Sequence, residues 1–185
     1  MKRILLFLII LTSLTSMAKP RGQIVCIDNS VFVAFCDDTI EDCISRQQKD
    51  NWCWAACVQM MMRYQGEWHP QSDIVKKVYG EPYNWTATGN DIAEAINGWN
   101  GWRAKSFKQK SGQILIDELV SYGPVMVGTE EHAYLLTHIY YTKDYTGEAS
   151  PFKAVLINPK TGREEVRNWS DFFPAINTIV SVWRY

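Results

Sequence analysis

One cysteine lies between two tryptophans at the predicted start of a helix. Helix-forming residues fill positions 52–65, beginning Trp-Cys-Trp-Ala-Ala, and Gly66 follows as a stop signal. Asp50 or Asn51 is expected to cap the start of this helix. Apolar residues nearly encircle it, which predicts a buried central helix. The thiol of Cys53 would then lie in the positive field of the helix N-terminus, which favours the nucleophilic thiolate.

The segments after this helix predict an α+β chain. Further helices are expected from residue 72 or 73 to 79, at 91–96 and at 112–122, and after Gly123-Pro124 the pattern changes to strands at 125–127, 132–141, 152–158, 164–166 and 178–183, with a helical turn at 170–173. Helices followed by an antiparallel sheet predict two lobes with a cleft between them. We place a helical lobe at 47–122 and a β lobe at 123–185. The preceding extension, residues 19–46, holds β-type runs at 24–27 and 31–35 that predict a small hairpin.

The first 18 residues have the pattern of a cleavable signal peptide. Lys2 and Arg3 precede an apolar run at residues 4–11, which is short for a membrane span. Small residues at positions 16 and 18 predict cleavage after Ala18. We therefore expect a secreted or periplasmic protein of residues 19–185, with no stable membrane insertion once the signal is removed. An uncleaved membrane anchor is the alternative.

The charge balance argues against a nucleic-acid partner. The chain has 19 basic and 20 acidic side chains, with no basic patch and no charge block. Its 185 residues, 46% of them hydrophobic, suffice for one domain with a sizeable core.

Five cysteines occur in the first third of the chain. An odd number leaves at least one thiol unpaired in an oxidising compartment. If Cys53 is free, Cys26, Cys36, Cys43 and Cys57 can form two disulfides, in any of three pairings. The alternative is that all five are reduced. The spacings differ from the paired C-x-x-C pattern of structural zinc sites.

A catalytic cysteine needs a base, and the chain offers three histidines. His69 precedes a proline in a loop and has no evident orienting partner, so we interpret it as a surface residue. His132 and His138 share a predicted strand but stand ~20 Å apart, so only one can serve a single site. A hairpin centred near residue 145 would place His132 opposite Asn158 and His138 opposite Phe152. The amide of Asn158 can then orient the ring of His132. A merely buried, hydrogen-bonded His132 is the structural alternative.

An oxyanion site would complete the chemistry. The backbone N–H of Cys53 points the right way at a helix start, and a side-chain donor from the loop just upstream would join it. Both Gln47 and Gln48 are candidates.

These residues resemble the papain-like cysteine peptidases. In that family a glutamine six residues before the nucleophile supplies the oxyanion donor, which selects Gln47. The later segments Gly123-Pro124-Val125, His132-Ala133 and Asn158-Pro159 are similar to the bacterial secreted branch, which includes staphopains, plant-pathogen effector proteases and bacteriocin-processing peptidases. The resemblance covers residues 44–185.

The resemblance implies a papain-like fold and a secreted cysteine endopeptidase. Its triad would be Cys53, His132 and Asn158, with Gln47 as oxyanion donor, no cofactor or metal, a protein or peptide substrate, and a monomer. Two departures stand out: Glu131 replaces a glycine of many relatives, and Asn158 stands where several carry aspartate. One competing hypothesis is a transglutaminase-like acyltransferase on the same fold. A non-catalytic secreted binding or toxin-like module is the other.

Overall fold

The computed structural model describes residues 22–185, so the predicted signal peptide and its cleavage site lie outside the described residues. The helices are α1 (Cys53–Tyr64), α2 (Gln71–Tyr79), α3 (Gly89–Asn97), α4 (Gly112–Tyr122) and α5 (Trp169–Phe172), with 3₁₀ turns η1 (Asp38–Cys43) and η2 (Phe173–Ala175). The strands are β1 (Gln23–Asp28), β2 (Val31–Phe35), β3 (Trp102–Ser106), β4 (Val125–Gly128), β5 (Ala133–Lys143), β6 (Ala149–Asn158), β7 (Arg163–Asn168) and β8 (Thr178–Arg184). Within this part of the chain, no helix combines the length and apolar character needed to cross a membrane.

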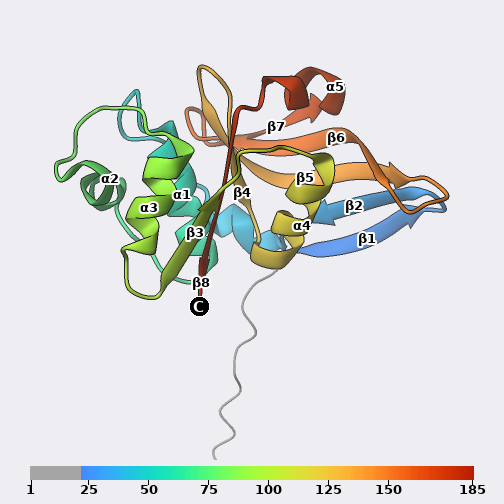
Figure 1. Cartoon of the computed structure of the whole chain (residues 1–185), viewed down its shortest axis with the longest axis horizontal. Coiled ribbons are helices and arrows are strands. Elements are labelled where there is room, and N and C mark those ends of the chain that lie inside the picture. Colours follow the sequence, from blue (N-terminus) through green and yellow to red (C-terminus); the bar gives the residue numbers. More distant parts are fainter. Residues whose placement is uncertain (1–21) are drawn as a thin grey trace, which may run out of the picture.

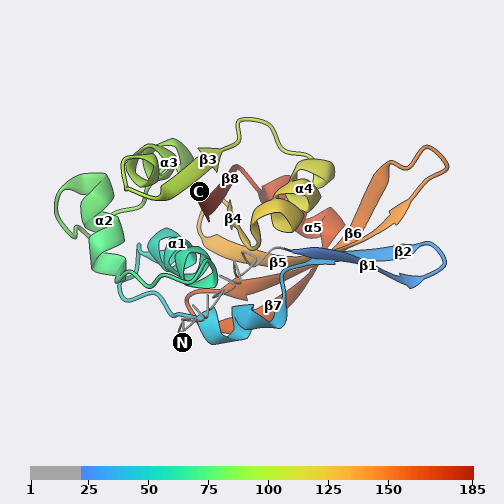
Figure 2. The same ribbon diagram turned by 90° about the horizontal axis from the view of Figure 1, so that it is seen from below.

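The eight strands within residues 22–185 form one antiparallel sheet centred on the long strand β5. One edge of β5 pairs with β4 near its start and with β2 near its end, and its other edge pairs with β6. Strand β8 joins β4 to β3, and β7 extends β6. Helices α1, α2 and α3 gather at one end of the molecule, while the β1–β2 and β5–β6 hairpins project at the other (Figures 1 and 2). The α+β class is confirmed.

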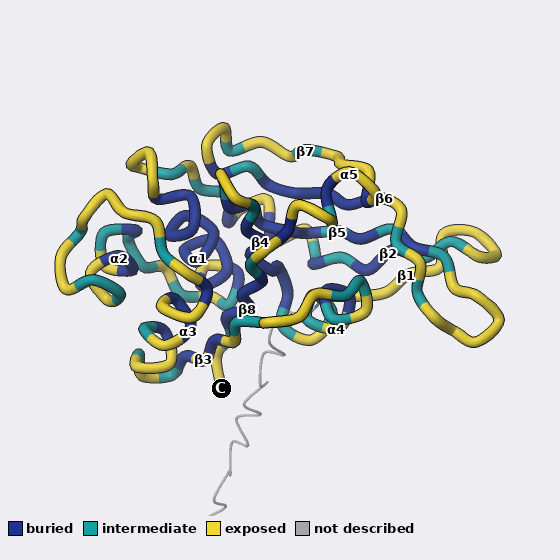
Figure 3. The backbone as a smooth tube through the Cα atoms, turned by 45° about the horizontal axis from the view of Figure 1, so that its top comes forward, coloured by how far each residue is buried: buried dark blue, intermediate teal, exposed yellow. Residues whose placement is uncertain are grey.

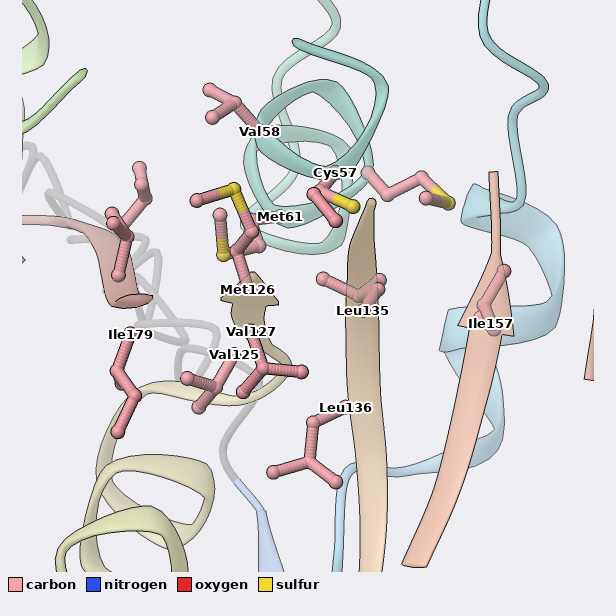
Figure 4. Packing of buried hydrophobic residues seen from close by; sticks show 14 of the residues in the cluster. Cys57, Val58, Met61, Val125, Met126, Val127, Leu135, Leu136, Ile157 and Ile179 are labelled. Atoms are coloured by element: carbon pink, nitrogen blue, oxygen red, sulfur yellow. The ribbon is translucent and has the colours of Figure 1, made fainter. Parts of the chain in front are cut away.

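Helix α1 is enclosed on all sides, as its apolar sequence predicts. Every residue of α1 except Arg63 is buried, and the tube in Figure 3 is dark along this helix. Figure 4 shows Cys57 and Met61 of α1 facing Met126 of β4 and Leu135 of β5. Burial of such a face is the main source of stability for a helix of this length. The helix is therefore the part of the core that fixes the position of Cys53.

The predicted capping of α1 is wrong. Its N-cap is Trp52, with no side-chain hydrogen bond to the helix start. The Asn51 side chain instead donates to the carbonyl of Asn84, 2.8 Å away. A tertiary hydrogen bond therefore engages the Asn51 side chain, which the local sequence predicted to cap the helix.

Other local expectations differ in detail from the structure. Helix α3 begins at Gly89 rather than at the predicted residue 91, because Thr88 caps it and forms a reciprocal capping box with Asp91. Strand β3 was not predicted, although Trp102 and Ala104 are buried and alternate with exposed neighbours, as a strand requires. Because β3 pairs with β8 and β2 pairs with β5, the sheet contains strands from the predicted extension, the predicted helical lobe and the predicted β lobe.

The two predicted disulfides are absent from the structure. All five cysteines, each within the described residues, are free thiols. Cys26 is exposed on the edge strand β1, whereas Cys57 is fully buried in α1. The buried thiols of Cys36 and Cys43 donate to the carbonyls of Thr137 and Thr39. Four of the five cysteines are therefore buried as free thiols, and the fifth, Cys26, is exposed.

Gly123 allows the end of α4 to approach the end of α1, and its replacement should destabilise the fold. Its φ is +91°, and an added Cβ would lie 2.3 Å from the Tyr64 ring. Gly66 has a similar φ of +88° but open space around it, so Gly66→Ala is a matched control. We expect Gly66→Ala to cost about 1–2 kcal/mol of unfolding free energy. Gly123→Ala should cost a further ~1–3 kcal/mol from the clash, measured by urea unfolding. Equal losses would contradict this packing argument.

Candidate active site

A small hollow of about 90 Å³ lies at the N-terminal end of α1. Its lining comes from the start of α1, the loop before α3, strand β4 and the segment leading into β5, and β8: Cys53, Trp54, Thr86, Ala87, Met126, Gly128, Thr129, Glu130, Glu131, His132, Ala133 and Thr178. The hollow thus brings Cys53 and His132, 79 residues apart in the sequence, to one surface.

The two tryptophans beside Cys53 fasten the neighbouring loop to the helix start. The indole N–H of Trp52 donates to the carbonyl of Tyr83 at 2.8 Å, and that of Trp54 donates to the carbonyl of Trp85 at 3.0 Å. Both indoles are almost fully buried. From the sequence, these tryptophans were recognised only as neighbours of Cys53. Their parallel hydrogen bonds explain why tryptophan occurs on both sides of the thiol.

The start of α1 leaves backbone donors available to the hollow. The first N–H groups of any α-helix have no intrahelical acceptor, and no side chain caps this one. The N–H of Cys53 is among these groups. Such a helix start favours negative charge nearby, either on a thiolate or on an oxyanion.

His132 is held by a turn and by Asn158. Its backbone carbonyl accepts from Thr129 N at 2.8 Å, and its own N–H donates to Thr129 Oγ1 at 3.2 Å. The Nε2 atom of the ring lies 2.9 Å from Asn158 Oδ1. The ring also packs edge-on against Tyr134, with centroids 4.7 Å apart. The pairing of His132 with Asn158 that the sequence predicted is therefore present.

The strand register from which we predicted this pairing is wrong. Leu135 pairs with Ile157, and His138 pairs with Val155 rather than Phe152, with register shifts along the hairpin. Bulges of this kind insert residues that no turn signal reveals. His132 lies just before β5 and Asn158 is the last residue of β6. Their side chains therefore meet at the open end of this hairpin, although the two residues are not a cross-strand pair.

Gln47 does not line the hollow in this structure. Both N–H groups of its side chain are engaged, since Nε2 lies 3.0 Å from the carbonyl of Lys49 and 2.7 Å from that of Asp50. Its backbone N–H donates to the carbonyl of Pro159 at 2.8 Å. Gln47 therefore links the loop before α1 to the loop after Asn158, and its role as an oxyanion donor stays a prediction.

The remaining histidines and Cys57 lie away from the hollow. His138 bonds to Thr137, and burial lowers its pKa. His69 is not the unpartnered surface residue that we predicted, because its ring pairs with Glu67 at 2.7 Å and packs on Trp99. Full burial raises the pKa of the Cys57 thiol well above its usual range, so this thiol is a poor nucleophile.

A larger hollow of about 390 Å³ adjoins the first and shares Thr129, Glu130 and Glu131 with it. Its other lining residues are Tyr134, Arg167, Asp171, Phe172 and Ala175. Tyr134 packs edge-on against Phe172, which gives this space an aromatic wall beside acidic side chains. The two hollows therefore share one wall, formed by residues 129–131.

Comparison with known proteins identifies the family of this arrangement. The sequence profile of the papain-like cysteine protease AvrRpt2 matches residues 37–176. The peptidase domain of Streptococcus ComA, a bifunctional ABC transporter involved in quorum sensing, superposes with a TM-score of 0.57 at 15% identity, covering 76% of this chain and 97% of that domain. The structure of UfSP from C. elegans gives a TM-score of 0.57 at 14% identity, covering 92% of this chain and 36% of that one. A search of curated sequences found no match. The papain-like fold is thereby confirmed.

Thiol labelling should separate the five cysteines by environment. Cys26 is exposed and Cys53 lines the hollow, whereas Cys57 is fully buried and burial raises the pKa of Cys36 and Cys43. We expect iodoacetamide near neutral pH to modify Cys26 and Cys53 in the native protein and to spare the other three, as read by peptide mass mapping. In denaturant without reductant all five should react. Protection of any cysteine pair under those conditions would show a disulfide.

Proposed function

Because the chain belongs to the papain-like cysteine protease AvrRpt2 family, we propose that it hydrolyses peptide bonds with Cys53 as nucleophile and His132 as general base. The observation that carries this proposal is the shared hollow, where a thiol at a helix start and an imidazole from the sheet line one surface. Family membership supports a peptidase over a non-catalytic binding module.

The contacts of Asn158 support different tasks for the two nitrogens of His132 in the proposed reaction. An amide oxygen only accepts hydrogen bonds, so His132 Nε2 must donate its proton to Asn158 Oδ1. In the neutral ring Nδ1 is then the unprotonated nitrogen, and it is available to take the proton of Cys53. Asn158 would thus hold the ring in the tautomer that the reaction needs.

The proposed reaction proceeds through an acyl-enzyme. His132 Nδ1 takes the thiol proton, and the thiolate of Cys53 attacks the carbonyl carbon of the substrate. The C–N bond breaks as the imidazolium returns its proton to the departing amine, which leaves a thioester on Cys53. His132 then takes a proton from water, the hydroxide attacks the thioester, and the acid is released with regeneration of the thiol.

The oxyanion of each tetrahedral intermediate would lie at the start of α1. The uncapped N–H of Cys53 supports this placement. We propose Gln47 as the second donor, and it would have to release the carbonyl of Lys49 or Asp50 to serve. Loss of that carbonyl contact is the local rearrangement that substrate binding would need to induce.

Replacement of Cys53 should abolish hydrolysis without loss of the fold. We expect Cys53→Ala to reduce turnover of a mixed peptide library by at least ~1,000-fold, because no other thiol reaches the hollow. Cys57→Ala is the matched control, one helical turn away and fully buried, and it should retain most of the activity. Products are read by mass spectrometry and folding by circular dichroism. Undiminished turnover by Cys53→Ala would refute the proposed nucleophile.

We further propose that the protein is exported and that a signal peptidase cleaves after Ala18. The basic start, the apolar run and the small residues at positions 16 and 18 support this. Expressed in a bacterium with a general secretion pathway, the protein recovered outside the cytoplasm should have the intact mass of residues 19–185. Replacing Ala18 with tryptophan should block processing, and an unprocessed wild-type chain would contradict the proposal.

A further inference from the structure

The side chain of Asn158 is fixed at both ends of its amide. Its oxygen accepts from the backbone N–H of Lys160 at 2.9 Å, besides meeting His132. Its nitrogen donates to Glu165 Oε1 at 2.7 Å. The backbone N–H can only donate and the carboxylate can only accept, so the two contacts require the same orientation of the amide. Oδ1 must face His132.

Glu165 reaches Asn158 because β7 folds back on β6. Its cross-strand partner is Leu156, two residues before Asn158, so Glu165 and Asn158 lie on the same face of the hairpin. The second oxygen of its carboxylate bonds to Arg167 Nη2. Only about a quarter of the Glu165 side chain is exposed, whereas its neighbours Glu164 and Val166 are both exposed to solvent.

The electrostatics agree with this geometry. The pKa of Glu165 lies below its usual range, first because Asn158 donates to it and then because Arg167 does. The carboxylate is therefore ionised near neutral pH and remains a strong acceptor for the Asn158 amide.

We propose that Glu165 is a positioning residue for the reaction, holding the Asn158 amide so that its oxygen faces His132 and keeps the proton on Nε2. This rests on the proposed roles of Cys53 and His132. The hydrogen bonds of Glu165 go to Asn158 and Arg167, so besides its charge attraction to His132 it acts through Asn158. Without it, the Lys160 N–H alone would orient the amide, and the His132 ring would lose part of its restraint.

The first test compares three variants at Glu165 and its neighbour. Glu165→Ala removes the acceptor, Glu165→Gln keeps an accepting oxygen, and Glu164→Ala changes the adjacent exposed carboxylate as a control. We expect Glu165→Ala to lower kcat about three- to tenfold with KM within about twofold. Glu165→Gln should recover most of the lost kcat, and Glu164→Ala should match the wild type. If Glu165→Ala is poorly folded, Glu165→Thr, which favours strands, takes its place.

The second test reads the imidazole directly and needs no activity. In the Cys53→Ala background, the ¹⁵N shifts of the His132 ring should show one tautomer with the proton on Nε2. Glu165→Ala should give a mixture of tautomers or faster exchange of that proton, and Glu165→Gln should restore the single form. Ring signals in Glu165→Ala identical to those in Glu164→Ala would overturn the proposal.

The two tests separate this inference from the proposed function. If Cys53→Ala hydrolyses peptides as fast as the wild type, the assignment of the nucleophile fails, while the ring signals still decide whether Glu165 controls His132. If Cys53→Ala is inactive but Glu165→Ala leaves both kcat and the ring signals unchanged, the proposed nucleophile stands and the role of Glu165 is refuted.

Discussion

The burial of α1 on all sides is the constraint on which the rest of the structure depends. A helix whose apolar residues nearly encircle it must be covered by several elements, and β4, β5, β8, α2 and η1 all contact it. Its one buried polar side chain, Gln59, is satisfied by His69, Ser45 and Gln71. With the helix fixed in this way, its first turn lines a hollow in the surface. That turn carries Cys53.

The surroundings of Cys53 are assembled by short polar contacts between distant loops. Trp52 and Trp54 fix the loop at residues 83–85, whose continuation lines the hollow. On the other side, Gln47 bonds to the carbonyl that follows Asn158 along the chain. These contacts join the helix start to both the loop before α3 and the end of β6. The thiol, the imidazole and the amide are therefore positioned by the backbone of three separate segments.

Much of this arrangement could be predicted from local sequence. The extents of α1 and α4 follow from helix formers bounded by glycines. The proposed site residues Cys53 and His132 were selected from residue chemistry and their order along the chain, and Asn158 also from a strand register that differs from the one observed. The register of β5 with β6 could not be predicted, because bulges depend on packing against neighbouring strands. Glu165 was missed for a related reason: nothing in its local sequence indicates that β7 brings it beside Asn158.

The sequence by itself determined the α+β class and the buried helix and selected the residues proposed for thiol chemistry, because these depend on periodicity and on side-chain type. Only the tertiary structure decided which groups satisfy one another. It left all five thiols unpaired, engaged both N–H groups of Gln47 with loop carbonyls, and set the amide of Asn158 between His132 and Glu165. Hydrogen bonds between distant segments depend on how the elements pack, and local sequence patterns carry no record of that packing.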